Sequence, residues 1–348
     1  MNQTCRRLIC LLVIFSILLG CKTIVTSATE TNAFTQVDPS SPSSIATATP
    51  SATESLPAAT GTGYILQEPT WQTPVIPPVV LPKLNATNHF VYDTRIRQFL
   101  TISGEPDDAI YPASTTKLFT SYVALQFLAP EDIITVGNEL SYVAYDASKA
   151  GFQKGDRVSV EALVYGALLP SGCDASYILA AAAGRILLGD ESASPKNAIA
   201  AFMDECNRLA KELGMENTNL VTPDGYHQKN HKISLGAFVS IAACSLENAT
   251  IAKVVSTPNV TITYTTKYGS IGTIKFENTN LMIHPTAAQY NPLCIGLKTG
   301  STGEAGYCLL SAFEVDGRYI LIGVFGCTTK YKRFDDTDKL LQTYLPYL

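Results

Sequence analysis

Runs of basic residues are missing from this 348-residue sequence, and charged residues of both signs make up only 16% of it. The formal net charge is -5 at pH 7. A nucleic-acid interface needs Lys and Arg gathered against phosphates, so this composition argues against a nucleic-acid partner. Hydrophobic residues, at 46%, are enough for a sizeable core. We therefore expect one large folded domain with appendages.

Paired cysteines are missing as well. The nine cysteines are scattered, and no two of them form a Cys-x-x-Cys pair. Neither a zinc knuckle nor a small disulfide framework is indicated, and most of the cysteines are expected to be small core residues. We predict no metal site and no cofactor.

The N-terminus has the layout of an export signal. Two arginines precede the apolar stretch 8–19, which is shorter than a typical membrane-spanning helix. The stretch ends in LLGC (18–21), which resembles a bacterial lipoprotein signal, so residues 1–20 should be removed and Cys21 lipidated. The alternative is an ordinary cleaved signal with an incidental cysteine. The protein is predicted to be extracytoplasmic and tethered to the bacterial cell membrane.

Residues 21–84 are predicted to form that tether. Between residues 41 and 60, 17 of 20 residues are Ser, Thr, Ala or Pro. Such a composition cannot bury enough apolar surface to offset the entropy of ordering. The folded domain is predicted to span 85–348. Because the chain stops soon after its last expected helix, we expect no second domain and no C-terminal anchor.

Apolar patterning predicts strands at both ends of this domain and helices in its middle. A mixed α/β (α+β) architecture is expected, with one sheet built from the two termini and a helical subdomain inserted at about 120–255. The Asp316-Gly317 turn should join the last two strands as a hairpin. The expected strands are 89–94, 97–103, 259–265, 272–277, 295–298, 307–315 and 318–326, and the expected helices are 114–128, 158–169, 174–187, 195–213, 234–246 and 331–344.

The segment PASTTK (112–117) holds the first candidate for chemistry. Ser114 and Lys117 are three residues apart at the start of an expected helix, so they share one face, and a neutral lysine there could accept the serine proton. Apolar neighbours would desolvate Lys117 and favour that neutral form. The N-terminus of the helix would offer N–H groups to an oxyanion. The alternative is a capped surface helix.

Two further segments are candidates for chemistry beside PASTTK. Lys298-Thr299-Gly300, followed by Ser301, suits recognition of a terminal carboxylate on an edge strand, and its glycine would let another backbone approach closely. Alternatively, the segment is a polar junction between a strand and a loop, without a role in binding. The segment LLPSGCDAS (168–176) carries a Ser-x-Asn-like triplet with a cysteine in third place. Ser-x-x-Lys, this triplet and Lys-Thr-Gly occur in the order typical of penicillin-binding proteins and serine β-lactamases.

The chain resembles the low-molecular-weight penicillin-binding proteins, which are serine-type D-alanyl-D-alanine carboxypeptidases. The resemblance covers about 88–345 and implies the β-lactamase/transpeptidase-like fold, an antiparallel sheet flanked by helices with an inserted helical subdomain. It also implies removal of the terminal D-alanine from peptidoglycan stem peptides that end in D-Ala-D-Ala, with β-lactams as covalent inhibitors. The similar segments are YPASTTKLFTSYVAL, LVYGALLPSGCDAS, AFMDECNRLAKELGMENTNLVTPDG and GLKTGSTGEAGYCLLSA.

By this resemblance, Ser114 is the acylated nucleophile and Lys117 its general base. Ser171 would relay a proton to the leaving D-alanine, and Lys298 with Thr299 would bind the substrate carboxylate. The backbone N–H groups of Ser114 and of the serine at 301 would form the oxyanion hole.

Two positions depart from the family's pattern. Cys173 stands where asparagine is usual; an amide can donate to a substrate carbonyl and accept from Lys117, whereas a thiol is a weak donor and a weak acceptor. Because Ser171 is intact, we expect an altered, slower site rather than an inactive one, with Cys173 in the substrate-binding wall. Asp224 stands before Gly225 where a histidine is common, and is expected to affect substrate shape.

Other functions stay open. A β-lactamase would need a Glu-x-x-x-Asn loop, but Glu205 is expected on a helix and is followed four residues later by Leu209. A zinc D,D-peptidase would use His227 and His231, which we expect to be solvated loop histidines. A catalytically weak penicillin-binding or peptidoglycan-binding lipoprotein is a third possibility. The sequence does not choose between carboxypeptidase, transpeptidase and endopeptidase activity.

Overall fold

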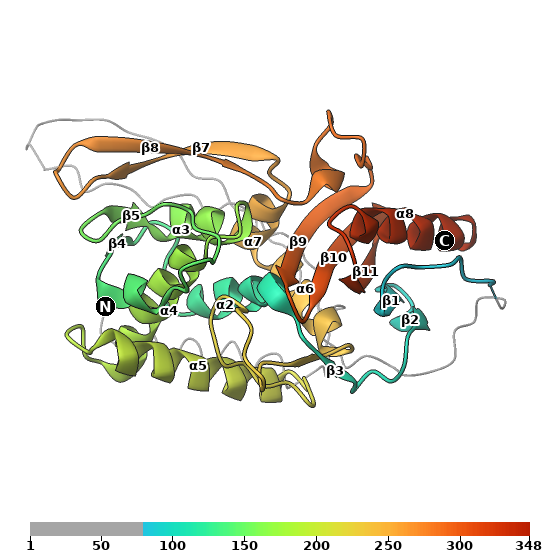
Figure 1. Ribbon diagram of the computed structural model, residues 1–348, viewed down its shortest axis with the longest axis horizontal. Coiled ribbons are helices and arrows are strands. Elements are labelled where there is room, and N and C mark those ends of the chain that lie inside the picture. The colour runs from blue at the N-terminus through green and yellow to red at the C-terminus, as the bar shows by residue number, and fades with distance from the viewer. Residues whose placement is uncertain (1–78) are drawn as a thin grey trace, which may run out of the picture. The chain divides into compact units, whose positions relative to one another are not determined.

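The computed structural model describes residues 79–348. Their central element is a five-stranded antiparallel sheet with the strand order β2-β1-β11-β10-β9 (Figure 1). Because β1 pairs with both β2 and β11, the two ends of the domain build one sheet, as predicted. The strands are β1 (Asn88–Asp93), β2 (Gln98–Ile102), β9 (Cys294–Thr302), β10 (Gly306–Val315) and β11 (Arg318–Cys327).

The expected hairpin between β10 and β11 is confirmed. Asp316 and Gly317 have φ values of 48° and 71°, the left-handed pair that a two-residue hairpin turn requires. Side chains then alternate along β10: Leu310 packs in the core with α2 (Thr116–Ala124) and α6 (Ala237–Glu247), whereas Leu309 packs in a second core with α8 (Lys332–Tyr344). Both faces of the sheet are therefore covered by helices.

The helical region between β2 and β9 has two buried helices at its centre. Eight of the nine residues of α2 (Thr116–Ala124) are buried, as is most of α4 (Cys173–Leu188). A Cβ at Gly184 would lie 1.9 Å from the carbonyl oxygen of Ala198, so α4 and α5 cross at a distance that only glycine permits. The remaining helices are α3 (Val160–Leu168), α5 (Pro195–Glu212), α6 (Ala237–Glu247) and α7 (Ala249–Val255), the last of which the patterning does not predict.

The strands at 259–265 and 272–277 do not join the central sheet, so their expected place in it is wrong. They form β7 (Asn259–Thr265) and β8 (Ile271–Glu277) in a separate four-stranded sheet of order β4-β5-β7-β8. Each of them has one buried side chain, Ile262 in β7 and Phe276 in β8. A strand of the central sheet must instead be apolar on both faces, because helices cover both faces of that sheet. The short strands are β4 (Ile133–Thr135), β5 (Arg157–Ser159), and the separate pair β3 (Ala109–Ile110) and β6 (Ile233–Ser234).

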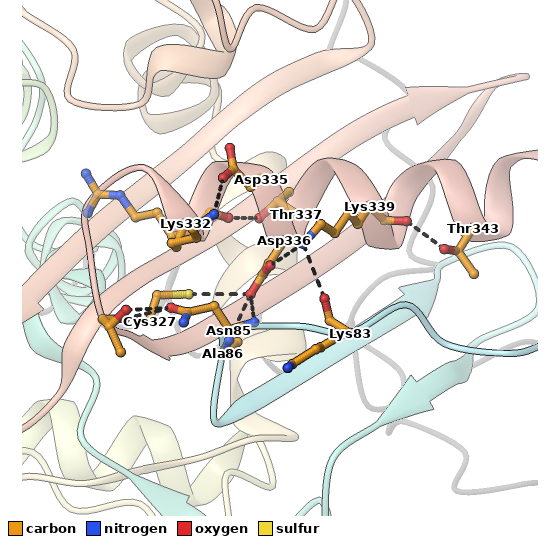
Figure 2. Close-up of polar contacts among 12 residues, drawn as sticks. Lys83, Asn85, Ala86, Cys327, Lys332, Asp335, Asp336, Thr337, Lys339 and Thr343 are labelled. Carbon is orange, nitrogen blue, oxygen red and sulfur yellow. Dashed lines mark hydrogen bonds and ion pairs between the residues drawn. The ribbon is translucent and has the colours of Figure 1, made fainter.

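Asp336 on α8 fixes the segment that leads into β1 (Figure 2). Its buried carboxylate accepts hydrogen bonds from the backbone nitrogens of Asn85 and Ala86, at 2.5 and 2.8 Å. Lys339 pairs with the same carboxylate at 3.2 Å and donates to the carbonyl oxygen of Lys83 at 3.2 Å. The start of the domain is thereby attached to its last helix.

The predicted signal peptide, the candidate lipidation site Cys21 and residues 21–78 of the predicted tether lie outside the described residues. Between residues 79 and 348, no single helix has the length and apolar character needed to cross a membrane. Only α6 and α7 taken together are long and apolar enough, and the chain bends by 100° between these two helices.

Candidate active site

Ser114 lies in a 3-10 turn, Ala113–Thr115, so α2 begins two residues later than predicted. Ser114 and Lys117 still face each other: the Nζ of Lys117 donates a hydrogen bond of 2.7 Å to the Oγ of Ser114. The same Nζ donates to the backbone oxygen of Asp224, also at 2.7 Å. Lys117 is fully buried, and Ser114 is partly exposed. The amine is therefore held within proton-transfer distance of an accessible hydroxyl.

Ser171 and Cys173 lie where α3 gives way to α4. Ser171 has a φ of 66°, and a Cβ at Gly172 would lie 2.6 Å from a carbonyl oxygen, so the chain turns sharply here. Ser148 holds this turn, because its carbonyl oxygen accepts from the nitrogen of Cys173 at 2.8 Å and its Oγ donates to the carbonyl oxygen of Ser171 at 2.6 Å. Sequence reasoning missed Ser148, which belongs to no motif.

The Cys173 thiol has only weak partners in this turn. Its Sγ lies 3.9 Å from the Oγ of Ser148 and 3.9 Å from the carbonyl oxygen of Ser171. Burial raises the pKa of the thiol, while the Lys117 ammonium lowers it and Asp224 raises it. Cys173 is therefore a protonated thiol at neutral pH rather than a nucleophilic thiolate.

The Lys-Thr-Gly segment lies on β9, at the edge of the central sheet. A Cβ at Gly300 would lie 3.0 Å from the backbone nitrogen of Ser114, so glycine allows β9 to pass close to the nucleophile. The Nζ of Lys298 donates to the carbonyl oxygen of Thr299 at 3.0 Å, and the Oγ1 of Thr299 lies 2.6 Å from that of Thr279. Burial, with the nearby charges of Lys117 and an arginine on α8, lowers the pKa of Lys298 well below its usual value.

That arginine is Arg333, which sequence reasoning also missed because it lies outside every motif. Its buried guanidinium donates to the backbone oxygens of Gly300 and Cys308, at 3.3 and 3.4 Å. Burial lowers its pKa to about 10, so it stays charged at neutral pH. Arg333 therefore ties α8 to the strand that passes the nucleophile.

Ser114, Cys173 and Ser301 line one cavity of about 440 Å³. Its remaining walls come from residues 146–148, 225–227 and 302–304. Four other predicted site residues do not line it directly, and each is at least nine-tenths buried: Lys117, Ser171, Lys298 and Thr299. A larger cavity of about 830 Å³ shares the turn 301–304 but is lined by none of these four residues nor by Ser114. The smaller cavity is therefore the candidate active site.

The expectation of two solvated histidines is wrong for His231, which is 1% exposed. Its Nδ1 accepts from the backbone nitrogens of Val221 and Thr222, at 3.0 and 3.2 Å, and its Nε2 lies 3.0 Å from the Oγ1 of Thr116. Both ring nitrogens are thus engaged, which leaves neither for zinc. Within residues 79–348, no group of three or more His, Cys, Asp or Glu is placed to hold a metal.

The two other residues singled out for alternative functions have local partners. His227 lies on the rim of the smaller cavity, with its Nδ1 3.3 Å from the Oε2 of Glu304. Glu205 lies on α5, where it pairs with Arg208 at 2.7 Å, and it does not line the cavity. The water-activating glutamate of a β-lactamase is therefore not supplied by Glu205.

The sequence model of peptidase family S11, described as D-alanyl-D-alanine carboxypeptidase, matches residues 77–329. The chain belongs to this family. It is 34% identical over 233 residues to the D-alanyl-D-alanine carboxypeptidase of Streptomyces sp. (strain K15), covering 66% of this chain and 76% of that protein. It is 28% identical over 271 residues to the carboxypeptidase DacA of Haemophilus influenzae, covering 76% of this chain and 63% of that longer protein.

Solved structures of similar proteins confirm the predicted fold class of this family member. The crystal structure of the Streptomyces K15 DD-transpeptidase aligns with a TM-score of 0.70 at 30% identity, covering 77% of this chain and 100% of that chain. The ampicillin-bound penicillin-binding protein D2 from Listeria monocytogenes aligns with a TM-score of 0.59 at 25% identity, covering 75% and 99%. The β-lactamase/transpeptidase-like fold is therefore shown.

Proposed function

We propose that this protein is a serine-type D-alanyl-D-alanine carboxypeptidase, which removes the terminal D-alanine from peptidoglycan stem peptides. The observation that carries the proposal is the 2.7 Å hydrogen bond from Lys117 to the Oγ of Ser114, a serine that opens onto a cavity of about 440 Å³. Membership of the S11 family supplies the class of reaction.

Acylation would start at the Ser114 hydroxyl. Lys117 takes its proton as the Oγ attacks the carbonyl carbon of the penultimate D-alanine, and the N–H groups of Ser114 and Ser301 hold the oxyanion. The amide bond to the terminal D-alanine then breaks, and Ser171 relays the proton from Lys117 to the leaving amine. Water hydrolyses the ester and regenerates the serine, so the cycle uses no cofactor and no metal.

Lys298 and Thr299 would bind the carboxylate of the terminal D-alanine. Lys298 is hydrogen-bonded to neutral atoms of Thr299, so an incoming carboxylate would supply the negative charge that its buried amine lacks. Burial lowers the pKa of Lys298, and a nearby carboxylate would favour its charged form.

Release of D-alanine from diacetyl-L-Lys-D-Ala-D-Ala tests the proposal. The parent protein is expected to release D-alanine, and the Ser114→Ala variant is expected to release none. A parent that a fluorescent penicillin labels at Ser114, but that releases no D-alanine, would instead be a penicillin-binding protein without carboxypeptidase activity. That result would reject the proposed function and favour the weak-binder alternative.

Transfer to an amine is a second candidate function, favoured by the match to a DD-transpeptidase, which covers 100% of that chain and 77% of this one. The same acyl-enzyme would then react with an acceptor amine instead of water. Adding glycine or glycylglycine to the tripeptide assay distinguishes the two outcomes. A transpeptidase would form a new peptide product at the expense of hydrolysis, whereas a strict carboxypeptidase would give the same products with and without the acceptor.

We also propose that the protein acts outside the cytoplasm, held to the cell membrane through a lipid on Cys21. The proposal is supported by the apolar stretch 8–19 followed by LLGC (18–21). Cells grown with labelled palmitate should yield a labelled protein, and the Cys21→Ala variant should yield an unlabelled one. Equal labelling of the two would exclude Cys21 as the lipidation site.

A further inference from the structure

The larger cavity, of about 830 Å³, lies next to the candidate active site. The turn 301–304 lines both cavities, so the two adjoin there. The mechanism proposed above uses only the smaller one, which leaves the larger cavity without a role. The other residues that line it are Lys232 and the segments 87–88, 109–111, 305–307 and 325–328.

The proposed reaction fixes the direction in which a stem peptide lies along β9. Its terminal carboxylate is bound at Lys298 and its scissile carbonyl at the N–H of Ser301, so the peptide runs antiparallel to this strand. In the described part of the chain β9 pairs only with β10, and its free edge can take an extended peptide as an added strand. The residues upstream of D-Ala-D-Ala then continue past Ser301 toward the turn 301–304 and the larger cavity.

The larger cavity contains a cation without an anionic partner. Of the described residues that line it, Lys232 is the only one with a basic side chain, and Glu304 is the only acidic one. Glu304 lies against His227, with its Oε2 3.3 Å from the Nδ1 of the ring. Within residues 79–348, no carboxylate pairs with Lys232. Its ammonium is therefore available to an anion that enters the cavity.

The position of Lys232 is fixed relative to the active site. Tyr111 follows β3 and Lys232 precedes β6, so the antiparallel pairing of these strands sets the two residues side by side. The Nζ of Lys232 lies 3.2 Å from the centre of the Tyr111 ring, and its backbone nitrogen and oxygen bond to Asn219 at 2.9 and 2.8 Å. Tyr111 also packs edge-on against His227, which lines the smaller cavity, with the ring centres 4.8 Å apart. A cation held in this way loses little conformational freedom when it binds an anion.

We propose that the larger cavity binds the part of the stem peptide upstream of D-Ala-D-Ala, and that Lys232 binds a carboxylate there. Stem peptides carry such a carboxylate on the γ-linked D-glutamyl residue, which precedes the diamino acid and the two D-alanines. The ion pair lies away from the reacting bond, so it adds binding energy for substrates long enough to reach it. The proposal rests on the carboxypeptidase function above and makes Lys232 a specificity-determining residue.

Two pentapeptides that differ in one group test this assignment. One is L-Ala-γ-D-Glu-L-Lys-D-Ala-D-Ala, and the other is the same peptide with the glutamyl α-carboxyl group amidated. Release of D-alanine gives kcat/KM for each. The parent should prefer the carboxylate peptide about fivefold, the size expected of a partly exposed ion pair, and Lys232→Met should use the two peptides equally. Because both peptides are compared on one protein sample, partial unfolding of a variant does not change the ratio.

Two control variants separate the charge of Lys232 from other effects. Lys232→Arg keeps the positive charge and should keep the preference for the carboxylate peptide. Lys229→Met removes an exposed lysine from the same loop that lines neither cavity, and it should also keep the preference. Added salt should reduce the preference of the parent, because it screens a partly exposed ion pair.

Equal kcat/KM of the parent for the two pentapeptides, or a preference that survives in Lys232→Met, would overturn the assignment. A preference that appears only when the glutamyl carboxylate is on an added acceptor peptide would place the acceptor in this cavity, and would overturn it as well.

Failure of the proposed function is a separate result. If the parent releases no D-alanine from either pentapeptide or from diacetyl-L-Lys-D-Ala-D-Ala, the carboxypeptidase function is wrong. Calorimetric titration of the two pentapeptides into Ser114→Ala, with and without Lys232→Met, then decides the binding role of Lys232 without turnover. Tighter binding of the carboxylate peptide that is lost with Lys232→Met would support that role, and equal binding of the two peptides would refute it.

Discussion

Lowering the pH is expected to destabilise the fold through His231. Its Nδ1 accepts hydrogen bonds from two backbone N–H groups, those of Val221 and Thr222. A proton added to Nδ1 would point at these donors, so the folded state favours the neutral ring. Burial is the main cause that lowers the pKa of His231 from 6.5 to about 4. The ring also bonds to Thr116, two residues after the nucleophile.

The sign and size of the effect follow from linkage between proton binding and folding. The unfolded chain takes up the proton at about pH 6.5 and the folded protein only near pH 4, so the contribution is complete above pH 6.5 and is lost as the pH falls toward 4. Each unit of pKa difference corresponds to about 1.4 kcal/mol. Between pH 7 and pH 5, His231 alone should therefore remove about 2 kcal/mol from the free energy of unfolding.

Urea unfolding at pH 7 and pH 5 measures this loss. His89 is also buried with a lowered pKa, so the test compares the parent with His231→Gln, which cannot be protonated. The parent should lose about 2 kcal/mol more than the variant over this interval. Equal losses in the two proteins would refute the assignment of a neutral, buried His231.

Three further substitutions test the packing of the site. Gly300→Ala should slow penicillin acylation more than about tenfold, with little change in urea unfolding, because its Cβ would lie 3.0 Å from the backbone nitrogen of Ser114. Gly225→Ala should lower the free energy of unfolding by about 2 kcal/mol or more, measured by thermal denaturation, since φ is 74° and the Cβ meets a carbonyl oxygen. Asp174→Asn should cost about 1–3 kcal/mol in urea unfolding, because the carboxylate accepts from three backbone N–H groups. Unchanged acylation or stability in any of these variants would contradict the corresponding contact.

Local patterns predicted the parts of the fold that depend on neighbouring residues. The central sheet, the hairpin at Asp316-Gly317 and most helices follow from apolar periodicity and turn chemistry. The second sheet was not predicted, because nothing local distinguishes β7 and β8 from strands of the central sheet. Only their pairing partner shows where they belong, and β5 lies far away in the sequence.

The candidate site was predictable to the same extent. Spacing alone suggested that Ser114 and Lys117 share one helix face, and in the structure the Nζ of Lys117 lies 2.7 Å from the Oγ of Ser114. The contacts to Asp224 and His231 could not be foreseen, because they join α2 to a loop more than 100 residues away. Ser148 and Arg333 were missed for the same reason, since each acts on the site through backbone atoms of distant segments.

The position of the covalent adduct formed with a penicillin is the most direct test of the account. The purified protein is treated with the β-lactam, digested, and mapped by tandem mass spectrometry. The account predicts a single adduct on Ser114, which is lost when Lys117 is replaced by an uncharged residue. An adduct on Ser171, Cys173 or Ser301, or no adduct on any residue of this cavity, would contradict the assignment of Ser114 and Lys117 as nucleophile and base.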